Sequence, residues 1–273
     1  MNSQWEYLLK NVGEWQGSFT RFSPQGELLE DIKSVVSLEA LNNNQTIHQV
    51  VRREGQPDLV LEYSSLPWST ILFPNGAFSQ GSIQLAPFGE FGAELGLIYE
   101  NRRLRLVHLF NKDSQLDKFV LIREHLAGTE PVENPPLQIN DLLGEWEGEA
   151  TTIYPDWSPP KNVSTNLKLQ LDDNGRLIQS LSFGYHPTIT STATIKGSII
   201  LFDENPEKQV QVVLLPNGAS ATSPLKMQIP QGLILEAGWL IKPNFRQRMV
   251  RCYNNKGEWV SLTLVTEQRI KTT

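Results

Sequence analysis

The hexapeptide VGEWQG at residues 12–17 recurs almost unchanged as LGEWEG at residues 143–148 of this 273-residue chain. Three further stretches recur in the same order: LFPNG (72–76) with LLPNG (214–218), AELGLI (93–98) with LEAGWL (235–240), and RLRLVHLFNKD (103–113) with RQRMVRCYNNK (246–256). The last match continues at the same spacing to Glu124 and Glu267. Four collinear matches indicate a duplicated domain.

The repeat predicts one domain over residues 1–126 and a second over residues 138–273. Residues 127–137 are predicted to be a linker, because they contain three prolines and no apolar periodicity. The second copy also has an extra loop, YPDWSPPK at residues 154–161, without a counterpart in the first copy.

Short runs of alternating apolar and polar residues fill both copies, as in FVLIRE (119–124) and VQVVLL (210–215). Turn signals such as PNG and DDNG separate them. The helical candidates are short and precede each Gly-Glu-Trp, at residues 3–11 and 138–143. The chain is therefore predicted to be all-β, with two antiparallel up-and-down barrels in tandem.

The repeated Gly-Glu-Trp is expected to plug the narrow end of each barrel. A glycine lets the chain turn sharply from helix into strand, and a tryptophan buries on the order of 200 Å². The residues with this structural role are Gly13, Trp15, Gly144 and Trp146.

Two arginine pairs are the best candidates for a binding site. Arg103 and Arg105 are two residues apart, as are Arg246 and Arg248, so each pair shares one face of a strand. The same faces continue with apolar residues, which suits an amphiphilic ligand whose carboxylate pairs with the planar guanidinium groups.

Structural ion pairs are the other explanation for these arginines. Glu94 and Glu236 lie on the preceding strands, where a hairpin would bring each carboxylate diagonally within reach of an arginine. The residues leave both explanations open.

The Gly-Glu-Trp motif behind a short helix resembles the first signature of the lipocalins and their calycin relatives. EAGWLIKPNFRQR, residues 236–248, is similar to a stretch of the S-type phycobiliprotein lyases, which are calycin barrels that hold open-chain tetrapyrroles. The tandem arrangement resembles an uncharacterised two-domain calycin family of photosynthetic organisms. These resemblances imply a bilin or another tetrapyrrole as a possible ligand.

The second copy is expected to hold the pocket. Trp239 replaces a leucine of the first copy, and Trp157 lies in the extra loop, which could cover a ligand. The expected ligand-binding residues are Arg246, Arg248, Trp239, Glu236 and Trp157, with Arg103, Arg105 and Glu94 as their first-copy equivalents.

Composition excludes several other functions. The net charge of −6 disfavours nucleic acid, and no apolar run approaches the roughly 18 residues of a membrane span. The start of the chain shows no secretory signal, and the single Cys252 fits a reducing compartment, so we expect the cytoplasm. No metal-ligand spacing and no catalytic motif is present, so we expect no metal site and no required cofactor.

The sequence therefore predicts binding of a hydrophobic, carboxylated small molecule in a barrel pocket, either bilin-like or fatty-acid-like, in a carrier-, chaperone- or lyase-like role. The alternative is a non-catalytic structural or protein-interaction module whose barrels are filled by side chains.

Overall fold

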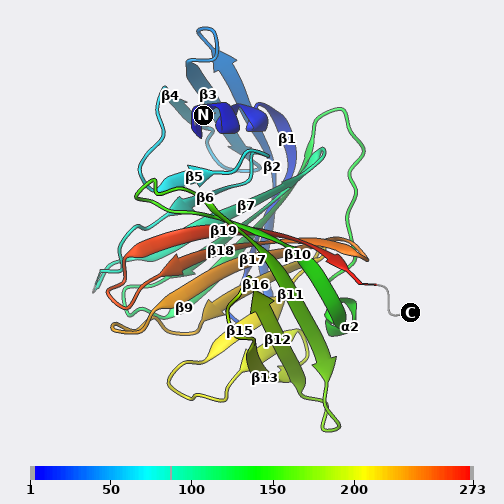
Figure 1. The fold of residues 1–273 in the computed structure, drawn as a ribbon. Helices are drawn as coiled ribbons and strands as arrows, with labels where there is room; N and C mark the ends of the chain where they lie inside the picture. The colour runs from blue at the N-terminus through cyan, green and yellow to red at the C-terminus, as the bar shows by residue number, and fades with distance from the viewer. Residues whose placement is uncertain (1–3, 87, 271–273) are drawn as a thin grey trace.

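The computed structural model describes residues 4–86 and 88–270, which form two successive all-β units (Figure 1). The first unit consists of α1 (Gln4–Leu8), the 3-10 helix η1 (Leu9–Asn11), β1 (Gly13–Phe22), β2 (Leu28–Leu41), β3 (Thr46–Arg53), β4 (Leu59–Tyr63), β5 (Thr70–Leu72), β6 (Phe78–Gly81), β7 (Phe91–Tyr99), β8 (Arg102–Phe110) and β9 (Leu116–Leu126). The second unit consists of α2 (Ile139–Leu142), β10 (Gly144–Ile153), β11 (Lys161–Leu171), β12 (Leu177–Phe183), β13 (Ile189–Lys196), β14 (Ile199–Phe202), β15 (Val210–Leu214), β16 (Ala219–Pro224), β17 (Leu233–Lys242), β18 (Phe245–Tyr253) and β19 (Trp259–Arg269).

The two units differ in closure. In the second unit, ten antiparallel strands close into a barrel, in which β10 pairs with both β11 and β19. In the first unit, nine strands form a curled antiparallel sheet in the order β4-β3-β2-β1-β9-β8-β7-β6-β5, and the described structure leaves its end strands unpaired with each other. The predicted all-β class is confirmed, with one closed barrel and one open, curled sheet.

Alternation along the strands sends side chains to two different cores. On β8, Arg103 and Arg105 point into the first unit, whereas Leu104 and Leu106 point to the other side of the sheet. The face of β8 toward the second unit is buried, and the inward face is buried at Arg103 and partly buried beyond it.

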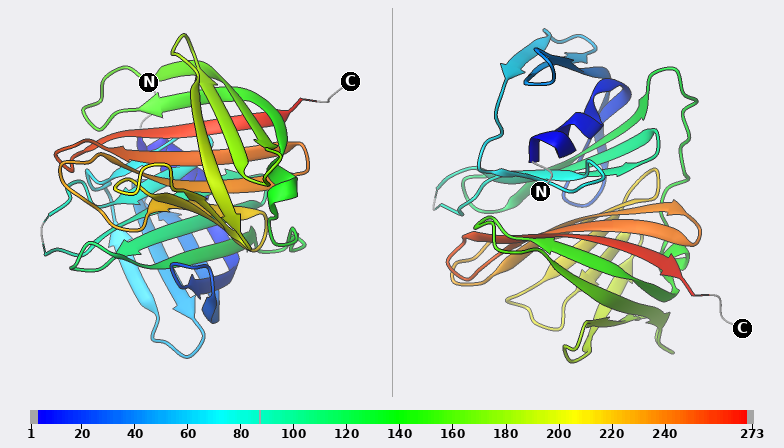
Figure 2. Two further views of the ribbon diagram at one scale, coloured as in Figure 1. Left: turned by 90° about the horizontal axis from the view of Figure 1, so that it is seen from below. Right: turned by 45° about the horizontal axis from the view of Figure 1, so that its top comes forward.

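The largest apolar core lies between the two units. Smaller cores surround Trp15 inside the first unit and Trp146 inside the second. The third and largest combines the outer faces of both sheets, where β7 and β8 lie against β17 and β18 (Figure 2). The two units are therefore joined face to face by a shared core.

Polar side chains at this shared core are also buried. The Arg251 guanidinium lies 3.5 Å from the Trp259 ring centroid and donates hydrogen bonds to Tyr253 Oη at 2.7 Å and Ser79 Oγ at 3.0 Å. His108 holds the corresponding place in the first unit, and burial lowers its pKa to about 3. At neutral pH the imidazole is therefore uncharged. In the described residues, no helix is both long and apolar enough to cross a membrane.

Candidate functional site

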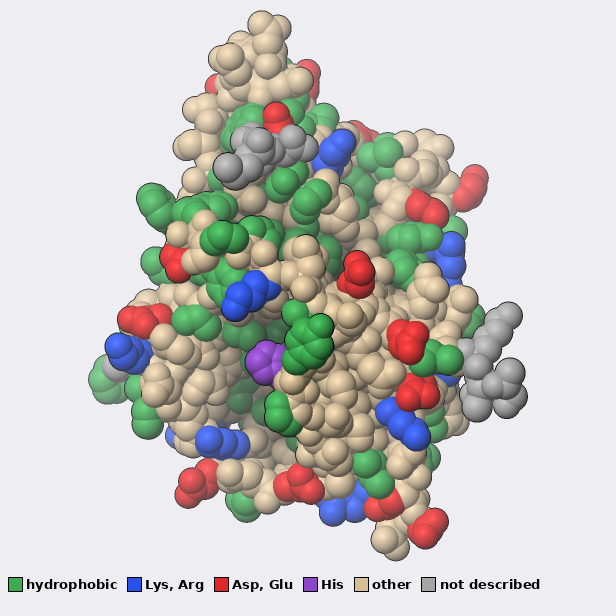
Figure 3. Space-filling model, in the orientation of Figure 1, with side chains coloured by type: hydrophobic (Ala, Val, Ile, Leu, Met, Phe, Trp, Pro, Cys, Tyr) green, Lys and Arg blue, Asp and Glu red, His purple; other side chains and the backbone are tan. Residues whose placement is uncertain are grey.

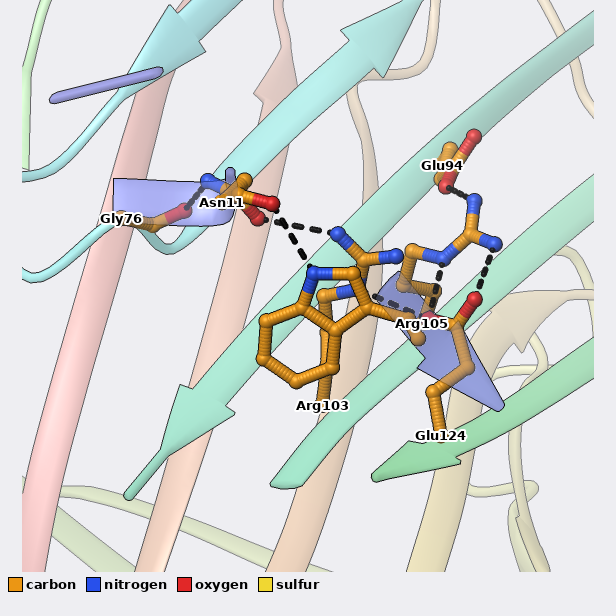
Figure 4. Close-up of polar contacts among 7 residues, drawn as sticks. Asn11, Gly76, Glu94, Arg103, Arg105 and Glu124 are labelled. Atoms are coloured by element: carbon orange, nitrogen blue, oxygen red, sulfur yellow. Dashed lines mark hydrogen bonds and ion pairs between the residues drawn. The ribbon is translucent and has the colours of Figure 1, made fainter. Parts of the chain in front are cut away.

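Four charged side chains meet inside the first unit (Figure 4). Arg103 and Arg105 come from β8, and the carboxylates of Glu94 and Glu124 come from the flanking strands β7 and β9. Glu124 accepts from Arg103 Nε at 2.7 Å and from Arg105 Nε and Nη2 at 3.0 and 2.9 Å. Arg105 Nη1 also donates to Glu94 at 2.7 Å. Glu124 is thus the shared acceptor of the cluster.

Trp15 and Asn11 support this cluster from the helical end. The Arg103 guanidinium carbon lies 4.4 Å from the Trp15 ring centroid, which is cation–π geometry. Asn11 Oδ1 accepts from Arg103 Nη1 at 3.1 Å, and the backbone carbonyl of Asn11 accepts from Trp15 Nε1 at 2.9 Å. The turns from the short helices into β1 and β10 need the positive φ angles found at Gly13 (138°) and Gly144 (116°).

The second unit repeats the charged cluster. Glu267 accepts from Arg246 Nε at 2.5 Å and from Arg248 Nε and Nη2 at 3.1 and 2.7 Å. Arg248 Nη1 donates to Glu236 at 3.1 Å. Each unit is therefore built around two arginines that share one buried glutamate.

The two clusters differ in the side chains around the tryptophan. Trp146 lies between two guanidinium groups, with its ring centroid 4.6 Å from Arg246 and 4.5 Å from Arg269. Its indole donates to the carbonyl of Leu142 at 2.9 Å, as the Trp of the first unit does to Asn11. Leu142 has no side-chain acceptor to match that of Asn11, and the buried Arg246 Nη2 has no hydrogen-bond partner in the described structure.

The electrostatics fix the charge states. Burial alone would raise the pKa of Glu124, but Arg103 and Arg105 outweigh burial and lower it to about 2. Glu267 has a pKa of about 2 for the same reason. Burial would lower the pKa of Arg105, but its two carboxylates outweigh burial and raise it. A carboxylate with so low a pKa is poorly matched to proton transfer near neutral pH.

The structure forms the ion pairs that sequence analysis offered as one explanation. Gly96 lies opposite Arg105, and Glu94 reaches that arginine diagonally, as expected for a hairpin of the two strands. The roles of Glu124 and Glu267 were not predicted, although the repeat continued to both at constant spacing. Ligand recognition by the arginines stays a prediction.

The two interiors differ in free volume. A cavity of about 270 Å³ inside the first unit is lined in part by Arg103, Arg105, Glu94 and Tyr63. The corresponding cavity of the second unit measures about 60 Å³. Since small-molecule pockets usually measure about 300–1,000 Å³, the second interior is nearly filled. The roomier interior belongs to the first unit, whereas we expected the pocket in the second.

The two tryptophans expected at a pocket do not place their rings in a barrel interior. Trp239 borders the small cavity of the second unit, but its side chain is buried in the core between the units, with the Arg102 guanidinium 5.3 Å from its ring centroid. It lies opposite Gln247 on β18, so its side chain and those of Arg246 and Arg248 leave opposite faces of the sheet. Trp157 is half exposed in the loop after β10 and lines neither barrel interior.

The thiol of Cys252 and the potential metal ligands do not form a second reactive site in the described residues. Cys252 borders a further cavity of about 320 Å³ at one end of the second barrel, and burial raises the pKa of its thiol. A raised pKa leaves less of the nucleophilic thiolate at neutral pH. Among residues 4–86 and 88–270, no three His, Cys, Asp or Glu side chains gather as a metal site.

Comparison with known proteins identifies the family of the chain. Residues 1–129 match the family described as "Domain of unknown function (DUF3598), N-terminal". Residues 133–270 match "Biogenesis factor required for ATP synthase 1, C-terminal domain". A crystal structure of a DUF3598-family protein of unknown function from Nostoc punctiforme PCC 73102 is 62% identical, covers 99% of this chain and 100% of its own, and has a TM-score of 0.96. The chain belongs to the DUF3598 family.

Other similarities of this DUF3598 chain are distant. The S-type phycobiliprotein lyase from Guillardia theta is 12% identical over 50% of this chain and 92% of its own, with a TM-score of 0.36. A putative outer membrane protein from Bacteroides fragilis is 11% identical over 98% of this chain and 100% of its own, with a TM-score of 0.25. No curated protein matches the chain. The predicted calycin relationship stays a prediction.

Proposed function

We propose that the protein is a non-catalytic factor that binds other proteins during the assembly of an ATP synthase. The family match over residues 133–270, described as a biogenesis factor required for ATP synthase, points to this process. The main support for a non-catalytic role is that both arginine pairs are engaged in ion pairs. Their shared glutamates hold them in place, and the second interior leaves only about 60 Å³ free. For the second barrel alone, this agrees with the alternative of a protein-interaction module whose barrels are filled by side chains.

Deleting the gene in the source organism tests the process. We expect less assembled ATP synthase on native gels, with unchanged synthesis of its individual subunits, and recovery when the gene is restored. In parallel, the purified protein is titrated with each purified subunit by calorimetry, and at least one subunit should bind. Normal assembly in the deletion strain, together with no binding of any subunit, refutes the proposal.

A second candidate is the binding of a small hydrophobic carboxylate, bilin-like or fatty-acid-like. The cavity of about 270 Å³ in the first unit supports it, since this volume is close to that of small-molecule pockets. A ligand carboxylate would compete for Arg105 with Glu94, whose side chain is 24% exposed, rather than with Glu124, which is fully buried.

The competition suggests a direct test. Biliverdin and palmitate are titrated into the protein, followed by the visible spectrum and by tryptophan quenching. Glu94→Gln should strengthen binding, because it frees an arginine donor inside the cavity. Glu236→Gln, the matched change in the nearly filled second barrel, should not. If neither compound binds wild type or Glu94→Gln, this candidate is excluded.

A further inference from the structure

The first sheet has nine strands where the second barrel has ten, and the short helix α1 covers the gap between its end strands β4 and β5 (Figure 1). The Gln4 side chain donates to the Leu72 carbonyl at 3.1 Å and accepts from the Leu72 N–H at 2.6 Å. On the β4 side, the rings of Trp5 and Tyr63 are T-shaped, with 6.3 Å between their centroids. Leu8 of the same helix lines the cavity of about 270 Å³. The helix therefore occupies the gap, and the space behind it remains a cavity inside the first unit.

Three neighbouring strands each place one polar side chain on the wall of this cavity. Thr70 on β5 lies opposite Gln80 on β6, and Gln80 lies opposite Glu94 on β7. Residues directly opposite each other share one face of a sheet, so these three side chains, which we name the polar row, lie side by side. All three line the cavity. Much of the remaining wall is apolar and includes Leu8, Val36, Leu38, Leu61, Leu66 and Phe78.

Thr70 is the member of the polar row whose hydrogen-bonding group the fold leaves unused. The residue is 7% exposed, and its buried Oγ1 has no hydrogen-bond partner in the described structure. Burying a hydroxyl without a partner costs about 1–3 kcal/mol. When LFPNG (72–76) is aligned with LLPNG (214–218), Thr70 corresponds to Val212, which has a similar shape without the hydroxyl and lines the nearly filled interior of the second unit. The hydroxyl thus occurs in the copy that keeps free space beside it.

The charges around the cavity favour a neutral ligand. Two guanidinium groups, of Arg103 and Arg105, are matched by two carboxylates, of Glu94 and Glu124, so the cluster has no net charge. A ligand carboxylate that entered beside Glu94 would meet a like charge and would have to displace it from Arg105. A hydroxyl needs no displacement, because it can donate to the Glu94 carboxylate and accept from the other members of the polar row.

We propose that the cavity of the first unit binds a small, neutral, apolar molecule that carries one hydroxyl group. The ligand hydroxyl donates to Glu94 and accepts from Thr70, and the apolar remainder packs against the leucine-rich wall. The volume of about 270 Å³ lies just below the usual range of about 300–1,000 Å³ and limits the ligand to less than drug size. Figure 3 shows hydrophobic side chains gathered on this part of the molecule, near α1 and β5. Such a ligand is independent of the proposed role in ATP synthase assembly, and it differs in charge from the carboxylate of the second candidate function.

Geraniol and geranic acid are the probes, because they share one hydrocarbon skeleton and differ in carrying a hydroxyl or an ionised carboxylate. Each is titrated into the full-length protein by calorimetry at pH 7. We expect geraniol to bind about tenfold or more tightly than geranic acid, because the acid meets the charge of Glu94. Tighter binding of geranic acid overturns the inference and supports the second candidate function instead. Binding of neither probe also overturns it and leaves a cavity that holds only water.

Thr70→Val tests the role of the unused hydroxyl. The variant introduces the residue of the second unit, and the unfolding midpoint should not fall, since the native Oγ1 has no partner to lose. Affinity for geraniol should fall about three- to tenfold, the effect of one net hydrogen bond, and Thr70→Ser should retain it. Ser34→Ala is the matched control, because Ser34 Oγ is also buried without a partner but does not line the cavity. Unchanged affinity in Thr70→Val, or an equal loss in Ser34→Ala, refutes the assignment.

Glu94→Gln tests the charge that excludes carboxylates. The glutamine keeps the size of the side chain and removes the like charge, so affinity for geranic acid should rise until the two probes differ by about threefold or less. Glu236→Gln, the same change in the nearly filled second barrel, should alter neither affinity. If Glu94→Gln keeps the wild-type preference for geraniol, Glu94 does not select the ligand, and the inference fails.

Discussion

Replacing Glu124 by glutamine keeps the shape of the side chain and removes its charge. The native carboxylate is fully buried and accepts three hydrogen bonds from Arg103 and Arg105. Removing one partner of a buried ion pair costs about 3–5 kcal/mol, because an uncompensated charge is left behind. The pKa of about 2, against an ordinary 4.5, corresponds to roughly 3 kcal/mol. We expect Glu124→Gln to lower the free energy of unfolding by about 3 kcal/mol.

Urea unfolding followed by tryptophan fluorescence measures the loss, with Glu94→Gln as the partly exposed control that should lose about 1 kcal/mol or less. The pH dependence provides a second reading. A carboxylate with a lowered pKa stabilises the fold above its unfolded pKa of about 4.5, and this stability is lost as the pH falls toward 2. The variant lacks this contribution of Glu124 and keeps that of Glu267, so its stability should fall less steeply between pH 5 and 2. Equal midpoints at pH 7, or equal slopes, would refute the reasoning.

Three other outcomes are expected from the packing. Trp15→Ala and Trp146→Ala should each lose about 3–5 kcal/mol in the same unfolding assay, and wild-type midpoints would contradict the plug role. Residues 138–273 expressed alone expose half of the shared core, so they should aggregate or bind a hydrophobic dye; a monodisperse folded fragment that excludes the dye would contradict this. Cys252 should react with iodoacetamide more slowly than free cysteine at pH 7, since burial raises its pKa, and equal rates would count against burial.

The repeat and the two-residue periodicity were sufficient to predict two all-β units, because neither signal depends on knowing which residues are in contact. The diagonal contact of Glu94 with Arg105 followed from the same reasoning. Periodicity separates the two faces of a strand but does not say which face is inside the barrel. For this reason Trp239 was expected on a pocket wall, although its side chain leaves the sheet on the outer face.

The open first sheet could not be predicted for a different reason. Closure of an antiparallel barrel depends on whether the number of strands is odd or even, and the periodicity does not determine the number of strands in either copy to within one. Residues 64–69, SSLPWS, have the composition of an ordinary loop. Only the full pairing pattern shows that this loop stands where the second unit has β14.

The differences between the two copies follow the side of the sheet on which they occur. Trp239 for Leu97, Arg251 for His108 and Tyr253 for Phe110 would each suit a ligand site in the second barrel if they pointed inward. All of these side chains are instead buried at the contact between the units, so these exchanges adapt two similar outer faces to each other. The arginines and glutamates inside the barrels are the same in both copies. Neither the contact nor the clusters explain the loss of one strand, which leaves the first sheet open and its interior roomier than that of the second unit.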